Sequence, residues 1–152
     1  MELVILFALA GGLFSVLTFI HFFVDWICQT HAEAMAKHNN AKVRARHCLI
    51  YTLGFVPLLL TFTYVGALTL LELSICLLIL FVSHFYLDTY HGVYLWAKYI
   101  RRPPEMDQAD TRQGFIQFVQ TTLGKILMIS IDQISHLFFL WPIVYMVLKH
   151  LH

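Results

Sequence analysis

The sequence predicts an all-α integral membrane protein built as a bundle of four transmembrane helices. Hydrophobic residues make up 59% of the 152-residue chain and charged residues only 12%, about half the charged fraction of a soluble domain. A soluble protein of this size could not bury so much apolar surface. The net charge of +1 argues against nucleic-acid binding through a basic face, and the apolar content excludes a disordered chain.

Four apolar stretches are long enough to cross a bilayer, which takes about 20 residues. They cover about residues 3–28, 48–70, 73–96 and 125–148 of a single transmembrane domain, 1–152. The second and third stretches are separated by a very short turn at Glu72, which predicts an antiparallel hairpin. Residues 114–124 are expected to form either an interfacial helix or an extension of the fourth span.

Most of the basic residues lie in two polar connections, at about 29–47 and 97–124, whereas the turn near Glu72 has no Lys or Arg. The positive-inside rule therefore places both connections in the cytoplasm and both termini outside.

Three of the four spans contain a His and an Asp separated by four residues, where chance would give about 0.6 such pairs in the whole chain. This spacing places both side chains on one face of a helix. An Asp in the middle of a membrane helix costs about 2.5–3.5 kcal/mol on insertion, so these groups must be paired, hydrated or bound to metal. The pairs are His21 and Asp25, His84 and Asp88, and Asp132 and His136.

The inferred orientation brings all three pairs to a similar depth, at about 1.5 Å of rise per residue, which favours one shared site. Imidazole nitrogen and carboxylate oxygen are ligands for zinc, with manganese or iron as alternatives. Helix bundles build such sites from inward-facing side chains. The alternative is a set of hydrogen-bonded pairs that clamp the helices together. The candidate metal ligands are His21, Asp25, His84, Asp88, Asp132 and His136.

Other polar residues extend this group. We expect the general base of a hydrolytic site to be Asp25, His47 or His91. Residues near the cytoplasmic end would bind a phosphate head group or the rest of a substrate. These candidates are Gln29, Lys37, Arg44, Arg46, Tyr51 and Gln133.

The motifs resemble the bacterial and phage membrane proteins of the family of domain of unknown function 3307. The resemblance implies a multi-pass protein of the bacterial cytoplasmic (inner) membrane and leaves the activity open. His91 stands where a Lys is expected three residues after the Asp of the third-span motif, which puts any role carried by that Lys in doubt. The resemblance rests on His21-x-x-x-Asp25-Trp26-x-x-Gln29, on Lys37, His47 and Tyr51, on Ser83-His84-Phe85-x-x-Asp88, and on Asp132-Gln133-x-x-His136-Leu137.

We therefore expect a membrane-embedded, metal-dependent hydrolase that acts on a lipid or lipid-linked phosphate from the cytoplasmic leaflet. One alternative is an oligomer that conducts or transports protons or metal ions along the His and Asp residues. Another is a non-enzymatic phage or bacterial membrane accessory protein. The expected partners are the lipid bilayer, a lipid-phosphate substrate and further copies of the chain, with no nucleic acid.

Overall fold

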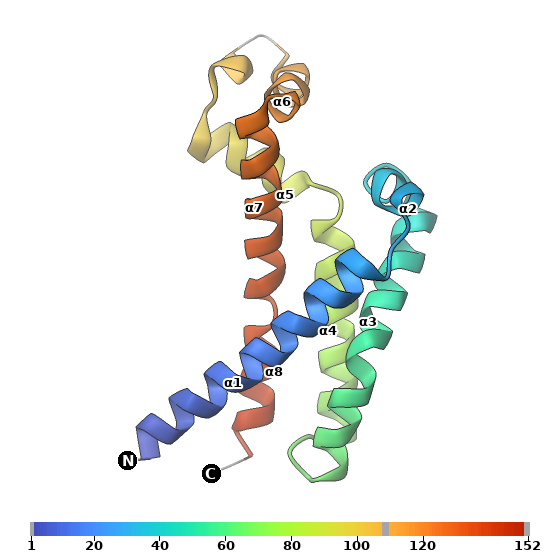
Figure 1. The fold of residues 1–152 in the computed structure, drawn as a ribbon, viewed down its shortest axis with the longest axis vertical. Coiled ribbons are helices and arrows are strands. Elements are labelled where there is room, and N and C mark those ends of the chain that lie inside the picture. The colour runs from blue at the N-terminus through green and yellow to red at the C-terminus, as the bar shows by residue number, and fades with distance from the viewer. Residues whose placement is uncertain (1, 108–109, 151–152) are drawn as a thin grey trace.

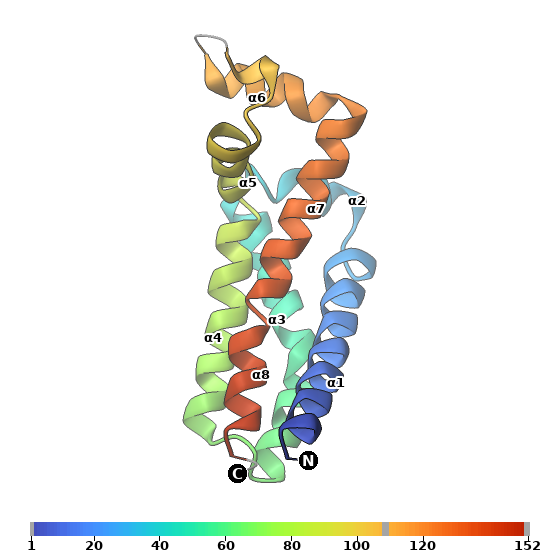
Figure 2. The same cartoon turned by 90° about the vertical axis from the view of Figure 1, so that its left-hand side faces the viewer.

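The computed structural model describes residues 2–107 and 110–150, and all the regular structure in this part of the chain is helical. The helices form an elongated bundle (Figures 1 and 2). Four segments are long and apolar enough to cross a membrane, namely Leu3–Ile27, Ala41–Tyr64, Leu70–Leu87 and Thr122–Leu148. The predicted all-α class with four candidate spans is therefore confirmed.

The first span joins helix α1 (Glu2–Phe22) to a π-helical turn, η1 (Phe23–Ile27). This turn closes with a hydrogen bond from the Cys28 amide to the Phe23 carbonyl oxygen, 3.2 Å long. Such wide turns are common at functional sites because they displace side chains from the regular helical positions. Here the turn carries Asp25, which is buried.

The first polar connection is partly helical. Helix α2 (His31–Ala36) begins at a capping box between Thr30 and Glu33. Helix α3 (Ala41–Tyr64) begins after Asn40, whose side-chain oxygen accepts hydrogen bonds from two backbone amides of the first turn. The second helix therefore starts at 41 rather than near 48, and the basic residues of this region, Lys42, Arg44 and Arg46, lie on its first turns.

Helices α3 and α4 (Leu70–Leu87) pack side by side as the predicted hairpin (Figure 1). The third helix ends at Leu87, whereas the sequence predicted a span to 96. The chain turns there because Tyr90 has a φ of 57°, a left-handed conformation that an α-helix does not allow. Helix α5 (His91–Trp96) and the turn η2 (Ala97–Arg101) then lead away from α4.

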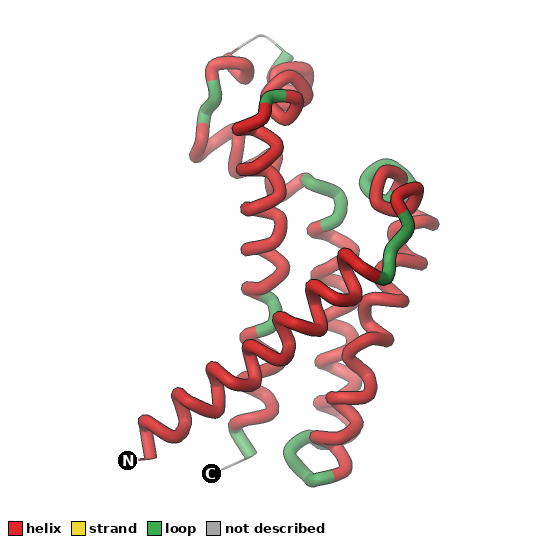
Figure 3. Tube along the Cα trace, in the orientation of Figure 1, coloured by secondary structure: helices red, strands yellow, loops and turns green. Residues whose placement is uncertain are grey.

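After the short turn η3 (Pro104–Asp107), helix α6 (Thr111–Gln120) crosses one end of the bundle (Figure 2). It is separate from α7 (Thr122–Phe138) because Thr121 has extended backbone and its hydroxyl accepts a hydrogen bond from the Gly124 amide. Residues 114–124 therefore do not simply extend the last span. Helix α8 (Trp141–Leu148) completes that span after a break that precedes Trp141, as the tube in Figure 3 shows.

The beginning of α1, the end of α8 and the α3–α4 turn lie at one end of the molecule, and α2, α5 and α6 lie at the other (Figure 1). This is the arrangement expected from the positions of the basic residues. At the first end, Glu72 contacts Lys149 and His150, and so links α4 to the residues after α8. Between the two ends lies an apolar core that contains Leu17, Phe55, Leu80 and Ile143.

Candidate metal centre

The three His–Asp pairs meet between the helices, on the side of the apolar core that faces α2. The ring centroids of His21 and His136 are 5.5 Å apart, and those of His84 and His136 are 4.4 Å apart. The six side chains of the pairs are all buried. The structure thus brings together the residues that the sequence assigned to one shared site.

Potential ligand atoms of four residues at this site lie close to the Nε2 atoms of His47 and His84. His47 Nε2 lies 3.0 Å from Asp25 Oδ1 and 3.0 Å from His84 Nε2. Asp88 Oδ2 lies 3.6 Å from His47 Nε2 and 3.5 Å from His84 Nε2. Ligand atoms of Asp25, His47 and His84 all lie within 4.8 Å of one another, as do those of Cys48, His84 and Asp88.

Lys37 reaches these atoms from the end of α2. Its Nζ lies 3.1 Å from Asp25 Oδ1, 3.0 Å from Asp88 Oδ1 and 3.1 Å from His47 Nε2. Burial by itself would lower the pKa of Lys37, but the carboxylates of Asp25 and Asp88 outweigh that effect and raise it. The side chain is therefore an ammonium ion in contact with both carboxylates.

The contacts around His47 exceed what its Nε2 atom can satisfy. That atom offers either one N–H or one lone pair, yet Lys37, Asp25 and His84 all lie at about hydrogen-bonding distance from it. The Lys37–Asp88 contact is an ion pair by distance without hydrogen-bond geometry, so neither oxygen of Asp88 has a hydrogen-bond partner among the described residues. The centre therefore contains more nitrogen and oxygen atoms at close range than its own hydrogen bonds can satisfy.

His21 is engaged at both of its ring nitrogens. Its Nε2 donates to Gln133 Oε1 at 2.9 Å, and its Nδ1 accepts from the Tyr51 hydroxyl at 3.0 Å. Gln133 Nε2 in turn lies 3.4 Å from Asp25 Oδ2 and 3.1 Å from Asp132 Oδ2. His21 was predicted as a metal ligand; in the structure both of its ring nitrogens are hydrogen-bonded, and Gln133 connects it to Asp25.

His136 and Asp132 have buried atoms that are free to bind something else. His136 Nδ1 donates to the Asp132 backbone oxygen at 2.8 Å, so the neutral ring keeps a lone pair on Nε2. That Nε2 and Asp132 Oδ1 are buried and have no hydrogen-bond partner within the described ranges, although Asp132 Oδ1 lies 3.8 Å from His136 Nδ1. Asp132 also lines a cavity of about 290 Å³ together with Asp25, Lys37 and Gln133. The centre is thus next to a space that can admit water or part of a substrate.

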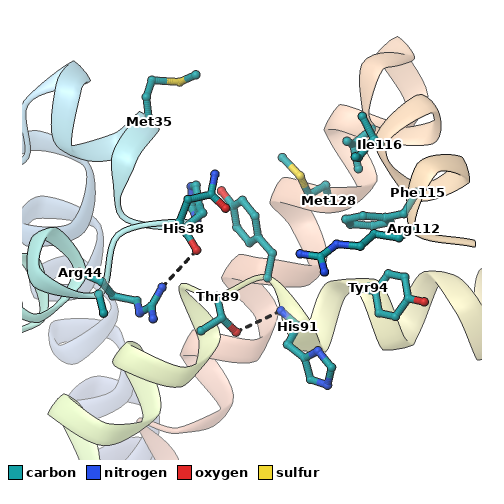
Figure 4. A pocket seen from close by; sticks show the side chains of 14 residues that line it. Met35, His38, Arg44, Thr89, His91, Tyr94, Arg112, Phe115, Ile116 and Met128 are labelled. Atoms are coloured by element: carbon teal, nitrogen blue, oxygen red, sulfur yellow. Dashed lines mark hydrogen bonds between the residues drawn. The ribbon is translucent and has the colours of Figure 1, made fainter.

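The other predicted site residues lie at different distances from this centre. Gln29 lines the same small cavity. Arg44 is buried and donates to the carbonyl oxygens of Lys37 and His38, whereas Arg46 is exposed and pairs with Glu33. His91 is exposed and lines a separate, larger cavity (Figure 4). The structure therefore does not bring His91 to the cluster, because α4 ends before it.

Sequence reasoning assigned His47 to proton transfer, but its Nε2 lies close to the other potential ligand atoms. The signal for this was available, since His47 and Tyr51 are four residues apart, as are the His and Asp of each pair. Gly54 helps to bring η1 to α3, because a Cβ at that position would lie 2.4 Å from Val24 Cγ2. This close approach places Asp25 beside His47.

The fold and site together define an all-α protein with four candidate membrane spans and a buried polar cluster among them. The chain belongs to the family described as protein of unknown function (DUF3307), whose model matches residues 13–151. This match confirms the resemblance found in the sequence. No curated protein and no solved structure matches the chain.

Proposed function

We propose that this protein is a membrane-embedded, metal-dependent hydrolase in which Asp25, His47, His84 and Asp88 hold the metal ion. The observation that carries the proposal is the 3.0 Å separation of His47 Nε2 and His84 Nε2, with Asp25 Oδ1 3.0 Å from the first and 3.5 Å from the second. Two imidazole nitrogens and two carboxylates are a donor set for zinc, and manganese or iron are alternatives.

The charge of the cluster also supports a divalent cation. With neutral imidazoles, the carboxylates of Asp25, Asp88 and Asp132 and the ammonium group of Lys37 sum to −2. Uncompensated charge is expensive to bury. A bound ion would supply Lewis-acid character and lower the pKa of a bound water.

The remaining residues fit the tasks of a hydrolytic site. Asp132 lines the small cavity and has a buried carboxylate oxygen that makes no hydrogen bond to the described residues, so it is the residue we assign as general base. Lys37 can hold an anionic oxygen of the substrate because this cationic residue lines the same cavity. His21 and Gln133 fix the orientation of Asp25 and Asp132 through the hydrogen bonds described above.

We propose a lipid or lipid-linked phosphate ester as the substrate. Hydrolysis would break its P–O ester bond, with water supplying a hydroxyl group to phosphorus and a proton to the alcohol that leaves. The centre lies near the end of the bundle that carries α2, α5 and α6 and most of the basic residues (Figure 1). In the orientation inferred from those residues, this end reaches the head groups of the cytoplasmic leaflet of the bacterial inner membrane.

Conduction of protons through a single chain is less well supported. The polar network ends at Tyr51, and the described core beyond it consists of apolar side chains such as Leu17, Phe55 and Leu80, which are at most 1% exposed. A proton path would require hydrogen-bonding groups or water across this layer.

The test measures bound metal and phosphate release on the purified full chain in lipid nanodiscs. We expect at least one zinc, manganese or iron ion per chain and chelator-sensitive release of phosphate from phosphatidic acid. Asp88→Asn should remove both, since the amide has a similar volume but no charge. The matched control is Asp107→Asn, which changes an exposed residue of η3. A metal-free wild-type chain that releases no phosphate from phosphatidic acid would overturn the proposal.

A further inference from the structure

A cavity with a volume of about 1000 Å³ lies apart from the cluster (Figure 4). It lies between the α2–α3 region and α5, α6 and α7. Its volume is at the upper end of the range for small-molecule sites, about 300–1,000 Å³. It is therefore large enough for a head group together with part of an apolar chain.

The cavity has cationic groups but no acidic residue in its described lining. Arg44 enters from α3 and Arg112 from α6, with the guanidinium group of Arg112 pointing toward the middle of the cavity (Figure 4). No described carboxylate forms an ion pair with either side chain. The remainder of the α6–α7 wall is apolar and includes Phe115, Ile116 and Met128.

Arg44 provides independent evidence for an anion. The residue is 9% exposed, and two of its hydrogen bonds go to the backbone oxygens of Lys37 and His38. Its Nε atom is buried and has no partner among the described residues. The guanidinium carbon of Arg44 also lies over the Phe85 ring, 4.6 Å from its centroid. No described carboxylate neutralises its charge, and a bound anion would do so. Guanidinium groups match the geometry of phosphate oxygens.

We propose that this cavity binds an amphiphilic phosphate monoester, with its phosphate between Arg44 and Arg112 and its chain against Phe115, Ile116 and Met128. The binding of this molecule does not depend on the proposed function. Only the statement that the bound molecule is the substrate rests on that function. The phosphate would account for the cationic lining residues. The apolar chain would account for the apolar residues of α6 and α7.

The two cavities share a wall made of His38 and Tyr90. These rings are stacked, with centroids 3.7 Å apart, and His38 Nδ1 donates to the backbone oxygen of Asp88 at 2.8 Å. A phosphate bound beside this wall would have the stacked pair between it and the cavity lined by Lys37 and Asp132. Displacement of the pair would let the head group reach the proposed metal centre.

The experiment measures binding of fluorescent phosphatidic acid to the full chain in phosphatidylcholine nanodiscs. Arg112→Gln should weaken binding about tenfold or more, while Arg112→Lys should retain part of it. Arg101→Gln is the matched control, because Arg101 is exposed and does not line the cavity. Equal binding of fluorescent phosphatidylcholine, or unchanged binding by Arg112→Gln, would overturn the proposal.

Two further arms separate the alternatives. Inorganic phosphate should compete only weakly, because it has no chain to contact Ile116. If it competes as strongly as unlabelled phosphatidic acid, the ligand of the cavity is free phosphate and not an amphiphile. The Asp88→Asn chain should bind phosphatidic acid as the wild type does, but it should contain no metal and release no phosphate. A metal-free wild-type chain that still binds phosphatidic acid through Arg112 would refute the hydrolase and support the cavity proposal.

Discussion

The Nε2 atoms of His47 and His84 face each other across the contact between α3 and α4 at 3.0 Å. Tyr51 contributes to this arrangement, since its ring stacks on that of His84 with centroids 3.8 Å apart. Its hydroxyl is also hydrogen-bonded to His21. One side chain thus sets the plane of an imidazole in the centre and orients a second imidazole beside it. Sites on rigid helices hold their geometry better than sites on loops.

Substitution of Lys37 distinguishes a metal centre from a lysine-centred clamp. Two unit charges about 4 Å apart repel by about 4 kcal/mol at an effective dielectric constant of 20, and a divalent ion by twice that. Lys37→Met should therefore raise metal affinity about tenfold or more, while it destabilises the metal-free chain by about 3–5 kcal/mol because it leaves carboxylates unpaired. The measurements are metal titration and thermal unfolding with and without chelator. Lys42→Met, on the exposed face of α3, is the control. A Lys37→Met chain that is destabilised but binds no metal would support the clamp.

The two functions of Tyr51 can be separated by a pair of variants. Tyr51→Phe keeps the ring beside His84 but removes the hydrogen bond to His21, so it should lower the free energy of unfolding by about 1–3 kcal/mol and retain metal. Tyr51→Leu also removes the stacked ring and should reduce metal content. Elemental analysis and thermal unfolding of the two variants test this, and equal metal content in both would show that the stack does not position His84.

Helix α2 should loosen in acid. The Thr30 amide donates to Glu33 Oε2 at 3.0 Å, and this hydrogen bond, with that of the Thr30 hydroxyl, holds the pKa of Glu33 below its ordinary value of 4.5. A lowered carboxyl pKa stabilises the folded state above pH 4.5, and this contribution is lost as the pH falls through the folded-state pKa. Hydrogen-exchange protection of α2 should therefore fall between pH 7 and pH 3. Glu33→Gln should show weaker protection with little pH dependence, whereas the same pH dependence in both chains would contradict this assignment.

The proposed orientation predicts the accessibility of two surface positions. Asn39, which lies between α2 and α3, and Asp107, the last residue of η3, are both exposed. Cysteines at these positions should react with impermeant reagents only from the cytoplasm, and tags on either terminus should be accessible only from outside. The background should be Cys28→Ser, because Cys28 is exposed. Labelling of positions 39 and 107 from opposite sides would require a different number of spans.

The sequence predicted the parts of this structure that depend on local patterns. The length of a span and the four-residue spacing of His84 and Asp88 can be read from the sequence, because a helix turns every 3.6 residues. The reach of Lys37 into the bundle depends on how α2 folds back, which no local pattern records. His91 was grouped with His84 because the apolar run continues to Trp96, but the backbone turn at Tyr90 separates them.

Glu72 holds together the end of the bundle at which α4 begins and α8 ends. Its contacts with Lys149 and His150 and its capping box with Thr69 fasten α4 to the residues that follow α8. At the other end, Lys37 and Arg44 tie the end of α2 to the bundle, so local opening should begin at α5 and α6, which line the larger cavity. Under the proposed function, such an opening would let a lipid enter and its product leave while the apolar layer between the two ends of the bundle stays packed.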